Sequence, residues 1–210
     1  MIAILDYGAG NLRSVELALR RLHVPSLVTR DPAQLHAAAG LILPGVGAFA
    51  DAMGALRRGG LVEPLLREVQ AGKPLLGICL GMQLLFEGSE EGPKEKGLGL
   101  IPGHVRRLPG EADGQRFKIP HIGWNVLDPN REDPLCAGLP AQPYVYFVHS
   151  YACHAARRED VLASCTYSET FDAAVHRGNI VGMQFHPEKS GAVGETLLLN
   201  FVNMAERGEG

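Results

Sequence analysis

The chain has 210 residues, of which 46% are hydrophobic, 20% charged and 6% aromatic, as is typical of a packed globular protein. Its 20 Lys and Arg side chains against 23 Asp and Glu give a net charge of −3, which excludes a basic field for nucleic acid and a polybasic membrane patch. The sequence also lacks a long uncharged apolar stretch, a basic signal-peptide region and any C-x-x-C pair. We therefore expect a cytoplasmic protein with one domain, residues 1–210.

The first half of the chain alternates short apolar runs with amphipathic segments. Helical spacing of apolar residues predicts a helix over 12–22, a short helix capped by Asp31-Pro32, and helical structure over 48–71 with an interruption at Gly59-Gly60. Strands are predicted at 2–5, 25–29, 41–43 and 75–78. Continuous apolar strands separated by amphipathic helices indicate an α/β fold, with a mostly parallel central sheet and helices on both faces.

The second half of the chain has a different residue pattern. Residues 87–99 are rich in glycine and charge, which predicts a loop. Strands without intervening helices follow, at 105–108, 117–127, 144–152, 161–167, 173–176 and 180–185. They predict an antiparallel or mixed extension of the sheet, closed by a helix over 191–205.

The segment Gly77-Ile78-Cys79-Leu80-Gly81 follows an apolar strand and precedes a helical run. This is the context of a nucleophile elbow of the form G-x-S-x-G, here with Cys79 as the nucleophile. The positive end of the helix dipole favours the thiolate form. The structural alternative is a buried cysteine whose neighbouring glycines serve packing.

A thiolate nucleophile needs an oriented base, and the segment His186-Pro187-Glu188 offers one. In an extended segment, residues two apart share a face, so Glu188 is expected to hold one ring nitrogen of His186. The other nitrogen would then face Cys79, as in a Cys-His-acid triad. The alternative is a solvated His and Glu at the end of a surface strand.

The backbone N–H of Leu80 is the expected first donor of an oxyanion hole. The second is expected from the turn Pro44-Gly45-Val46-Gly47, although taken alone this sequence is an ordinary turn. Two glycine-rich stretches resemble nucleotide-binding loops but lack the residues that those motifs require. No metal site and no cofactor are expected.

Cys79 in GICLGMQ, together with His186-Pro187-Glu188, resembles the class I, triad-type glutamine amidotransferases. Matching stretches run from Asp6 to Ser190, and they are DYGAGNLRSVELAL, LPGVGAF, GICLGMQLLFEGSEEG, GLGLIPGHV, KIPHIGWN, YFVHSY and GMQFHPEKS. The triad motifs are common to the family. The PHIGWN and DYGAGN stretches resemble one member in particular, whose ammonia is used by a separate cyclase subunit with a (β/α)8 barrel.

The resemblance implies that Cys79, His186 and Glu188 hydrolyse glutamine, with Val46 and Leu80 at the oxyanion hole. The substrate residues that it implies are Gly45, Gly47, Gln83, Ser150 and Tyr151. The implied interface with the cyclase consists of Tyr7, Asn11, Arg13, Pro120, His121, Trp124, Asn125 and Lys189. Simple core packing is the alternative for Trp124.

Other functions remain open at this point. A glutaminase subunit that serves anthranilate or pyridoxal phosphate synthesis would share the triad, but the KIPHIGWN stretch disfavours it. A cysteine peptidase-like thiol hydrolase would use Cys79 and His186 and would need an open groove. A binding module that has kept the fold without catalysis is disfavoured by the intact triad.

Overall fold

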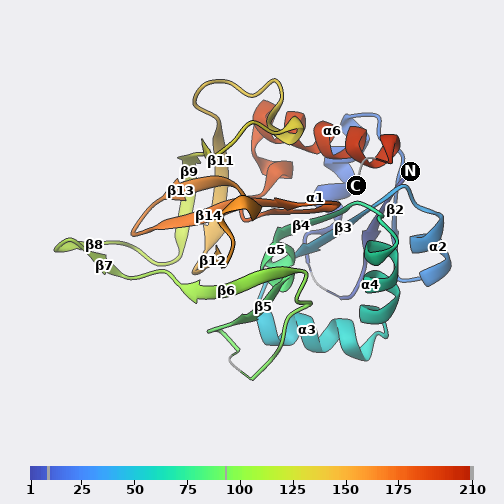
Figure 1. The fold of residues 1–210 in the computed structure, drawn as a ribbon, viewed down its shortest axis with the longest axis horizontal. Coiled ribbons are helices and arrows are strands. Elements are labelled where there is room, and N and C mark those ends of the chain that lie inside the picture. Colours follow the sequence, from blue (N-terminus) through green and yellow to red (C-terminus); the bar gives the residue numbers. More distant parts are fainter. Residues whose placement is uncertain (9, 93, 209–210) are drawn as a thin grey trace.

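The centre of the molecule is a twisted β-sheet, shown in Figure 1. The computed structural model describes residues 1–8, 10–92 and 94–208; Ala9 and Pro93, and the last two residues of the predicted domain, lie outside the described residues. Within the described part, eleven strands form this sheet, with the order β2-β1-β3-β4-β15-β14-β12-β6-β5 along its main path.

The parallel half of the sheet comes mainly from the first half of the chain. Its strands are β1 (Ile2–Leu5), β2 (Ser26–Thr29), β3 (Gly40–Gly45), β4 (Leu75–Cys79) and β15 (Ile180–Met183). Each neighbouring pair is parallel, including β15 against β4. The last strand of the chain therefore inserts beside β4 and brings the residues that follow Met183 close to Cys79.

The antiparallel extension is built from the second half of the chain. It contains β6 (Ile101–Arg107), β10 (Asp128–Pro129), β12 (Tyr151–Ala155), β13 (Val161–Thr166) and β14 (Thr170–Arg177), with β5 (Phe86–Ser89) parallel to β6 at the edge. Two separate ribbons pair β9 (His121–Val126) with β11 (Tyr144–His149) and β7 (Glu111–Ala112) with β8 (Gln115–Arg116). The predicted α/β fold with its mixed extension is confirmed.

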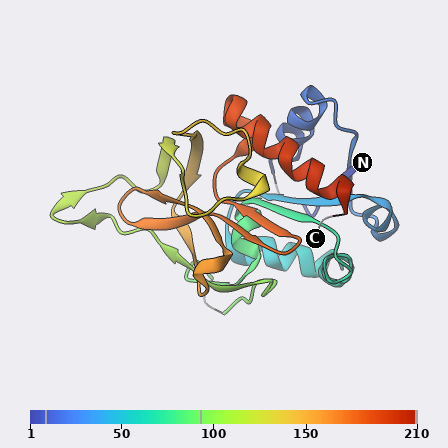
Figure 2. The ribbon, with the colours of Figure 1, turned by 45° about the horizontal axis from the view of Figure 1, so that its top comes forward.

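Helices cover both faces of the sheet, as Figure 2 shows. The alternation of side chains along β1 explains why: Ile2 and Ile4 pack in one core, and Ala3 and Leu5 in the other. The first core includes α1 (Leu12–Arg21) and α6 (Gly191–Arg207). The second includes α2 (Pro32–Ala37), α3 (Phe49–Arg58), α4 (Val62–Gln70) and α5 (Leu80–Leu84).

The loop predicted over 87–99 is wrong in its first part. Residues up to Ser89 belong to β5, and Gly88 bridges to Lys96. Glu87, the one charged residue of this strand, is exposed, while Gly88 and Ser89 are buried. The Glu87 carboxylate also accepts a hydrogen bond from the backbone N–H of Gly103 at 2.9 Å. Composition alone did not reveal this pairing, and Pro93 lies outside the described residues.

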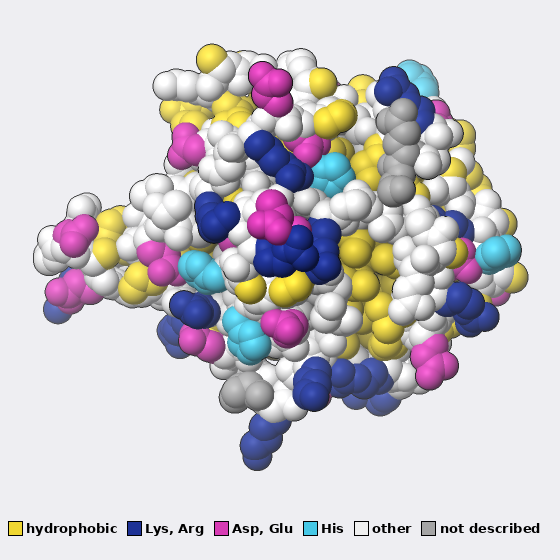
Figure 3. Space-filling view, in the orientation of Figure 1, with side chains coloured by type: hydrophobic (Ala, Val, Ile, Leu, Met, Phe, Trp, Pro, Cys, Tyr) yellow, Lys and Arg dark blue, Asp and Glu magenta, His cyan; other side chains and the backbone are white. Residues whose placement is uncertain are grey.

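Acidic and basic side chains are interspersed on the face of the molecule shown in Figure 3. None of the helices in the described part of the chain is both long and apolar enough to cross a bilayer. The cytoplasmic location stays a prediction.

Candidate active site

Cys79 lies at the sharp turn between β4 and α5. Its φ and ψ of 55° and −111° are unusual for a residue with a side chain, and such strain is common at functional sites. The two flanking glycines are required by close approach of the backbone. A Cβ at Gly81 would meet the carbonyl group of Leu43, and one at Gly77 would meet the backbone of Gly81. The local geometry is that of an elbow which presents the Cys79 side chain at the end of the sheet.

His186 and Glu188 follow β15 and lie beside each other. The Nδ1 atom of His186 is 2.8 Å from Oε1 of Glu188, and both side chains are fully buried. The extended geometry predicted for this segment was wrong beyond His186, since Pro187–Lys189 forms a single 3-10 turn, η3. Proline suits the first position of a helical turn because its φ is already fixed there. The turn, rather than a strand, brings the carboxylate to the ring.

The environment of His186 favours its protonated form. Burial acts to lower the pKa of His186, but interactions with the Cys79 thiol and the Glu188 carboxylate outweigh it and raise that pKa to about 9. Burial acts to raise the pKa of Glu188, yet hydrogen bonds from His186 and Asn11 hold it below its usual value. We therefore expect an imidazolium paired with a carboxylate at neutral pH, beside the Cys79 side chain.

A cavity of about 290 Å³ opens beside Cys79 and His186. Within the described part of the chain, the buried Nε2 atom of His186 has no hydrogen-bond partner. The cavity thus joins a thiol and a ring nitrogen that is free to exchange a proton. It is lined by Val46, Gly47, Cys79, Leu80, Gln83, Glu91, Pro120, Val148, His149, Ser150, Tyr151 and His186.

Four of the five predicted substrate residues line this cavity, namely Gly47, Gln83, Ser150 and Tyr151. The Gln83 amide also donates to the carbonyl of Tyr151 at 3.0 Å, which fixes this wall. Gly45 does not line the cavity. A Cβ there would meet the hydroxyl of Tyr7 and, at 3.1 Å, Cβ of Leu80, so this glycine makes room for packing under the turn.

Both residues predicted for the oxyanion hole, Val46 and Leu80, line the cavity. Leu80 is buried, whereas Val46 is 43% exposed. The two backbones lie close because β3 and β4 are parallel neighbours, with Gly45 opposite Cys79.

The predicted interface residues fall into two groups. Trp124 is 55% exposed, and Arg13, Pro120 and Lys189 are also exposed. Asn125 is half-buried and donates to the carbonyl of Thr166 at 3.0 Å.

The other three predicted interface residues are buried or half-buried. Tyr7 is buried, and its hydroxyl donates to the carbonyl of Pro44 at 2.8 Å. His121 is buried and stacks on Phe147 and Tyr167. Asn11 is half-buried, and its amide reaches Glu188.

Sequence reasoning missed three residues at the site. The Glu91 carboxylate lines the cavity and accepts from the backbone N–H of Phe49 at 2.7 Å; its charge-rich segment gave no signal of this. The Gln184 amide lies 3.9 Å from Sγ of Cys79, and its position two residues before His186 could have indicated it. His149 lines the cavity and contacts His121 at 3.1 Å.

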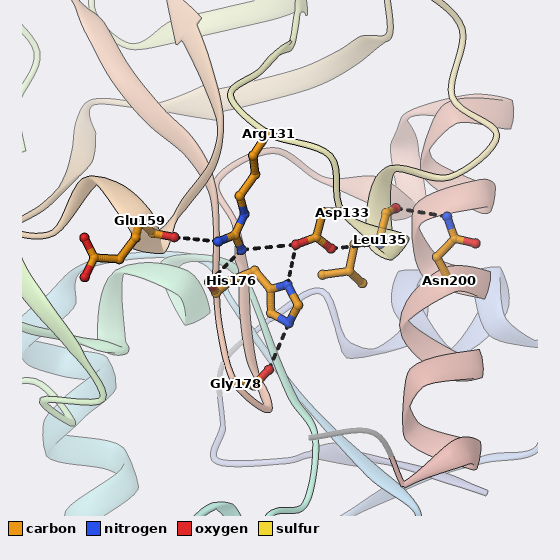
Figure 4. Close-up of polar contacts among 7 residues, drawn as sticks. All are labelled: Arg131, Asp133, Leu135, Glu159, His176, Gly178 and Asn200. Carbon is orange, nitrogen blue, oxygen red and sulfur yellow. Dashed lines mark hydrogen bonds and ion pairs between the residues drawn. The ribbon is translucent and has the colours of Figure 1, made fainter.

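A larger cavity, of about 520 Å³, lies beside α6 and away from Cys79. Figure 4 shows the polar residues near it. His176 lines this cavity, but its Nδ1 contacts Asp133 at 2.7 Å and its Nε2 contacts the carbonyl of Gly178 at 2.8 Å. Because both ring nitrogens are occupied, we assign the chemistry to the smaller cavity. Among the described residues, no group of three or more His, Cys, Asp or Glu side chains could hold a metal ion.

Residues 3–204 match the model of the family described as glutamine amidotransferase class-I. The chain belongs to this family. The fold agrees: a crystal structure of a glutamine amidotransferase has a TM-score of 0.76 at 22% identity, covering 98% of both chains. PurLQS from Thermotoga maritima has a TM-score of 0.71 at 19% identity, covering 96% of this chain and 97% of that one.

Relatives with higher sequence identity indicate which member of the family the chain resembles. The imidazole glycerol phosphate synthase subunit HisH of Oceanobacillus iheyensis is 50% identical over 97% of this chain and 99% of its own length. The HisH subunit of Halalkalibacterium halodurans is 52% identical over 99% and 98%, respectively. The predicted resemblance to one particular member of the class I glutamine amidotransferases is confirmed.

Proposed function

We propose that the chain hydrolyses glutamine to glutamate and ammonia and passes the ammonia to a cyclase subunit of imidazole glycerol phosphate synthase. That subunit would make imidazole glycerol phosphate and AICAR in histidine biosynthesis. The observation that carries the proposal is the arrangement of Cys79, His186 and Glu188 around one cavity, in a chain about half identical to HisH subunits over nearly its full length.

The first half of the reaction uses the thiolate of Cys79 as nucleophile. It attacks the side-chain amide carbon of glutamine, and the negative charge that develops on the amide oxygen is expected to face the backbone N–H groups of Val46 and Leu80. Protonated His186 then gives its Nε2 proton to the amide nitrogen. The carbon–nitrogen bond breaks, ammonia leaves, and a glutamyl thioester remains on Cys79.

The second half releases glutamate. Neutral His186 takes a proton from water, and the resulting hydroxide attacks the thioester carbon. The carbon–sulfur bond breaks, glutamate leaves, and the thiolate and imidazolium are restored. Throughout both halves, Glu188 is expected to keep its bond to Nδ1, so that Nε2 always faces the cavity.

The cavity also has features that suit free glutamine. A volume of about 290 Å³ is small for a peptide chain and adequate for one amino acid. Glu91 places a carboxylate on the wall, where it would attract the α-ammonium group of the substrate. These two features favour a glutaminase over a cysteine peptidase-like thiol hydrolase.

A partner is supported by the surface around β9. Ile122 and Trp124 are 59% and 55% exposed, and they lie two residues apart on the same face of the strand. Large exposed apolar side chains of this kind are typical of interaction sites. We propose that this surface, with Arg13, Pro120, Asn125 and Lys189, meets a (β/α)8 cyclase subunit. A route for ammonia between the two subunits that is shielded from water would matter, because ammonia in water at neutral pH is mostly ammonium, which is not nucleophilic.

The test measures glutamate released from glutamine, with and without the cyclase subunit, by the wild type and by Cys79→Ala. We expect turnover only in the wild type, increased by the cyclase. Cys136→Ala is the matched control, since this free thiol is half-buried and outside the cavity. Absence of glutamine turnover in every condition would contradict the proposal. Turnover that only an anthranilate or pyridoxal phosphate synthase partner increases would favour those alternatives.

A further inference from the structure

Asn11 makes a contact that its predicted place at a partner interface does not require. Its amide Nδ2 donates to Oε1 of Glu188 at 2.6 Å and lies 3.4 Å from Nδ1 of His186. The two side chains are 177 positions apart in the chain. The same carboxylate oxygen therefore receives hydrogen bonds from the base of the triad and from Asn11.

We infer that Asn11 is a positioning residue of the triad, which fixes the Glu188 carboxylate and through it the ring of His186. The inference rests on the proposed function, because it concerns the same reaction. It assigns to the segment before α1 a role in holding the triad, in addition to its predicted role in binding the cyclase.

The backbone at Asn11 explains why asparagine suits this role. Its φ of 76° is in the left-handed region, which Gly, Asn and Asp tolerate better than other residues. Of these three, glycine has no side chain and an ionised aspartate only accepts hydrogen bonds. Asparagine is thus the one of the three that can both adopt this conformation and donate to Glu188.

The Asn11 side chain does not cap the helix that it precedes. Asn11 directly precedes α1, and asparagine is among the best N-cap residues. Yet within the described part of the chain its side chain makes no capping hydrogen bond to α1. The helix thus lacks a common stabilising contact at its first turn, and the amide is available to Glu188.

The carboxylate has little else to hold it. The Glu188 side chain is fully buried, and its Oε2 atom has no partner among the described residues. The hydrogen bond from Asn11 is one of the causes that keep the pKa of Glu188 low despite burial. Without it, His186 would be the remaining side-chain donor to this carboxylate, and the ring would be less well fixed.

The test compares Asn11→Gly and Asn11→Asp with the wild type. Glycine keeps the backbone conformation and removes the donor, whereas aspartate keeps the shape and places a second carboxylate against Glu188. His23→Gly is the matched control, since His23 is exposed at the other end of α1 and also has a positive φ, of 56°. Two rates are measured: glutamate release with the cyclase subunit present, and alkylation of Cys79 by iodoacetamide without glutamine.

For Asn11→Gly we expect kcat to fall about 10- to 100-fold, the effect of losing a hydrogen bond to a charged group, while KM changes less than about twofold. Alkylation of Cys79 should slow by a similar factor. Asn11→Asp should lose more, because like charges repel. His23→Gly should match the wild type in both rates.

Unchanged kcat and alkylation in Asn11→Gly would overturn the inference, and so would an increase in KM alone, which would make Asn11 a binding residue. If Asn11→Gly does not fold, Asn11→Asp decides: wild-type rates in that variant overturn the inference. The proposed function fails separately. A wild type whose Cys79 is alkylated rapidly, but which releases no glutamate with the cyclase, would contradict that function and leave the role of Asn11 in place.

Discussion

Two pairs of histidine and carboxylate in this molecule, one fully buried and one partly buried, have nearly the same nitrogen–oxygen distance. The pair His186–Glu188 has a nitrogen–oxygen distance of 2.8 Å, and the pair His176–Asp133 has one of 2.7 Å. In both, the contact is made by Nδ1. Distance alone therefore does not distinguish a catalytic pair from a structural one.

The second ring nitrogen distinguishes them. Nε2 of His176 is bonded to the Gly178 carbonyl, and Asp133 also contacts Arg131 at 3.1 Å. This network ties the segment around Asp133 to the end of β14 (Figure 4). Nε2 of His186, by contrast, lacks a partner in the described part of the chain and belongs to a residue that lines the cavity with Cys79. A histidine with one fixed and one free nitrogen can transfer a proton, whereas a saturated one stabilises the fold.

The largest expected effect is the contrast between His186→Gln and His176→Gln. The first should lower kcat by about 10³-fold or more, because the proton donor and acceptor is lost. The second should leave kcat within about twofold and lower the free energy of unfolding by about 1–3 kcal/mol. Glutamate release and urea unfolding measure the two quantities. A large loss of activity in His176→Gln at unchanged stability would break the comparison.

The same contrast applies to the carboxylates. Glu188→Gln should lower kcat by about 10²- to 10⁴-fold, because the amide can present the wrong hydrogen-bonding atom to Nδ1 and no longer balances the imidazolium. Asp133→Asn should instead cost about 1–3 kcal/mol of stability, since Arg131 and the partly buried His176 lose a charged acceptor. Steady-state kinetics and unfolding curves of both variants provide the test. Equal effects on kcat would show that the two pairs do not differ in function.

A smaller effect is expected from the turn beside the cavity. Gly45→Ala should lower stability by about 1–3 kcal/mol and reduce kcat, because its Cβ would push against Tyr7 and Leu80. Gly110→Ala is the control, since a Cβ there meets no atom of the described residues within 4 Å. Thermal unfolding of both variants measures the difference. A Gly45→Ala variant as stable and active as the control would show that the turn adapts.

The smallest expected effect is the pH dependence of stability that comes from His121 and His149, whose ring nitrogens are 3.1 Å apart. Burial lowers the pKa of His121 to about 4 and that of His149 to about 3, so both are neutral in the folded state. Unfolded, each would bind a proton below a pH of about 6.5. Their contribution to stability is therefore complete above that pH and is lost progressively as the pH falls toward 4 and 3, by about 1–2 kcal/mol per group near pH 5.

Urea unfolding between pH 7 and pH 4 checks this expectation. The His121→Phe variant keeps a ring that can stack on Phe147 and Tyr167 but removes one titrating group. Its stability should fall less steeply with acid than that of the wild type. An identical slope for the two proteins would mean that His121 does not titrate on unfolding.

The sequence predicted the features that are encoded locally. The elbow follows from two glycines around Cys79 at the end of an apolar strand, and the closeness of His186 and Glu188 from their spacing. The conformation between them was not predictable in the same way, since proline suits both an extended segment and the start of a helical turn. Tertiary contacts decide it: the His186 N–H donates to the Tyr146 carbonyl, and the Ser190 hydroxyl to the His186 carbonyl at 2.6 Å.

The contacts that the sequence did not reveal join distant segments. Asn11 reaches Glu188 across the whole chain, and Glu91 reaches the cavity from a stretch whose composition resembles a loop. Neither residue carries a local pattern that distinguishes it from a surface polar residue. The insertion of β15 beside β4 creates the site, and strand order is a property of the complete sheet.

The most direct test of the central claim is to look for the thioester itself. Wild-type protein, mixed with glutamine in the presence of the cyclase subunit, is quenched in acid during turnover, digested, and analysed by mass spectrometry. We predict a glutamyl adduct on the peptide that contains Cys79 and no adduct in Cys79→Ala. Steady glutamate release with no adduct on Cys79, or with an adduct on Cys136, Cys153 or Cys165 instead, would contradict the account.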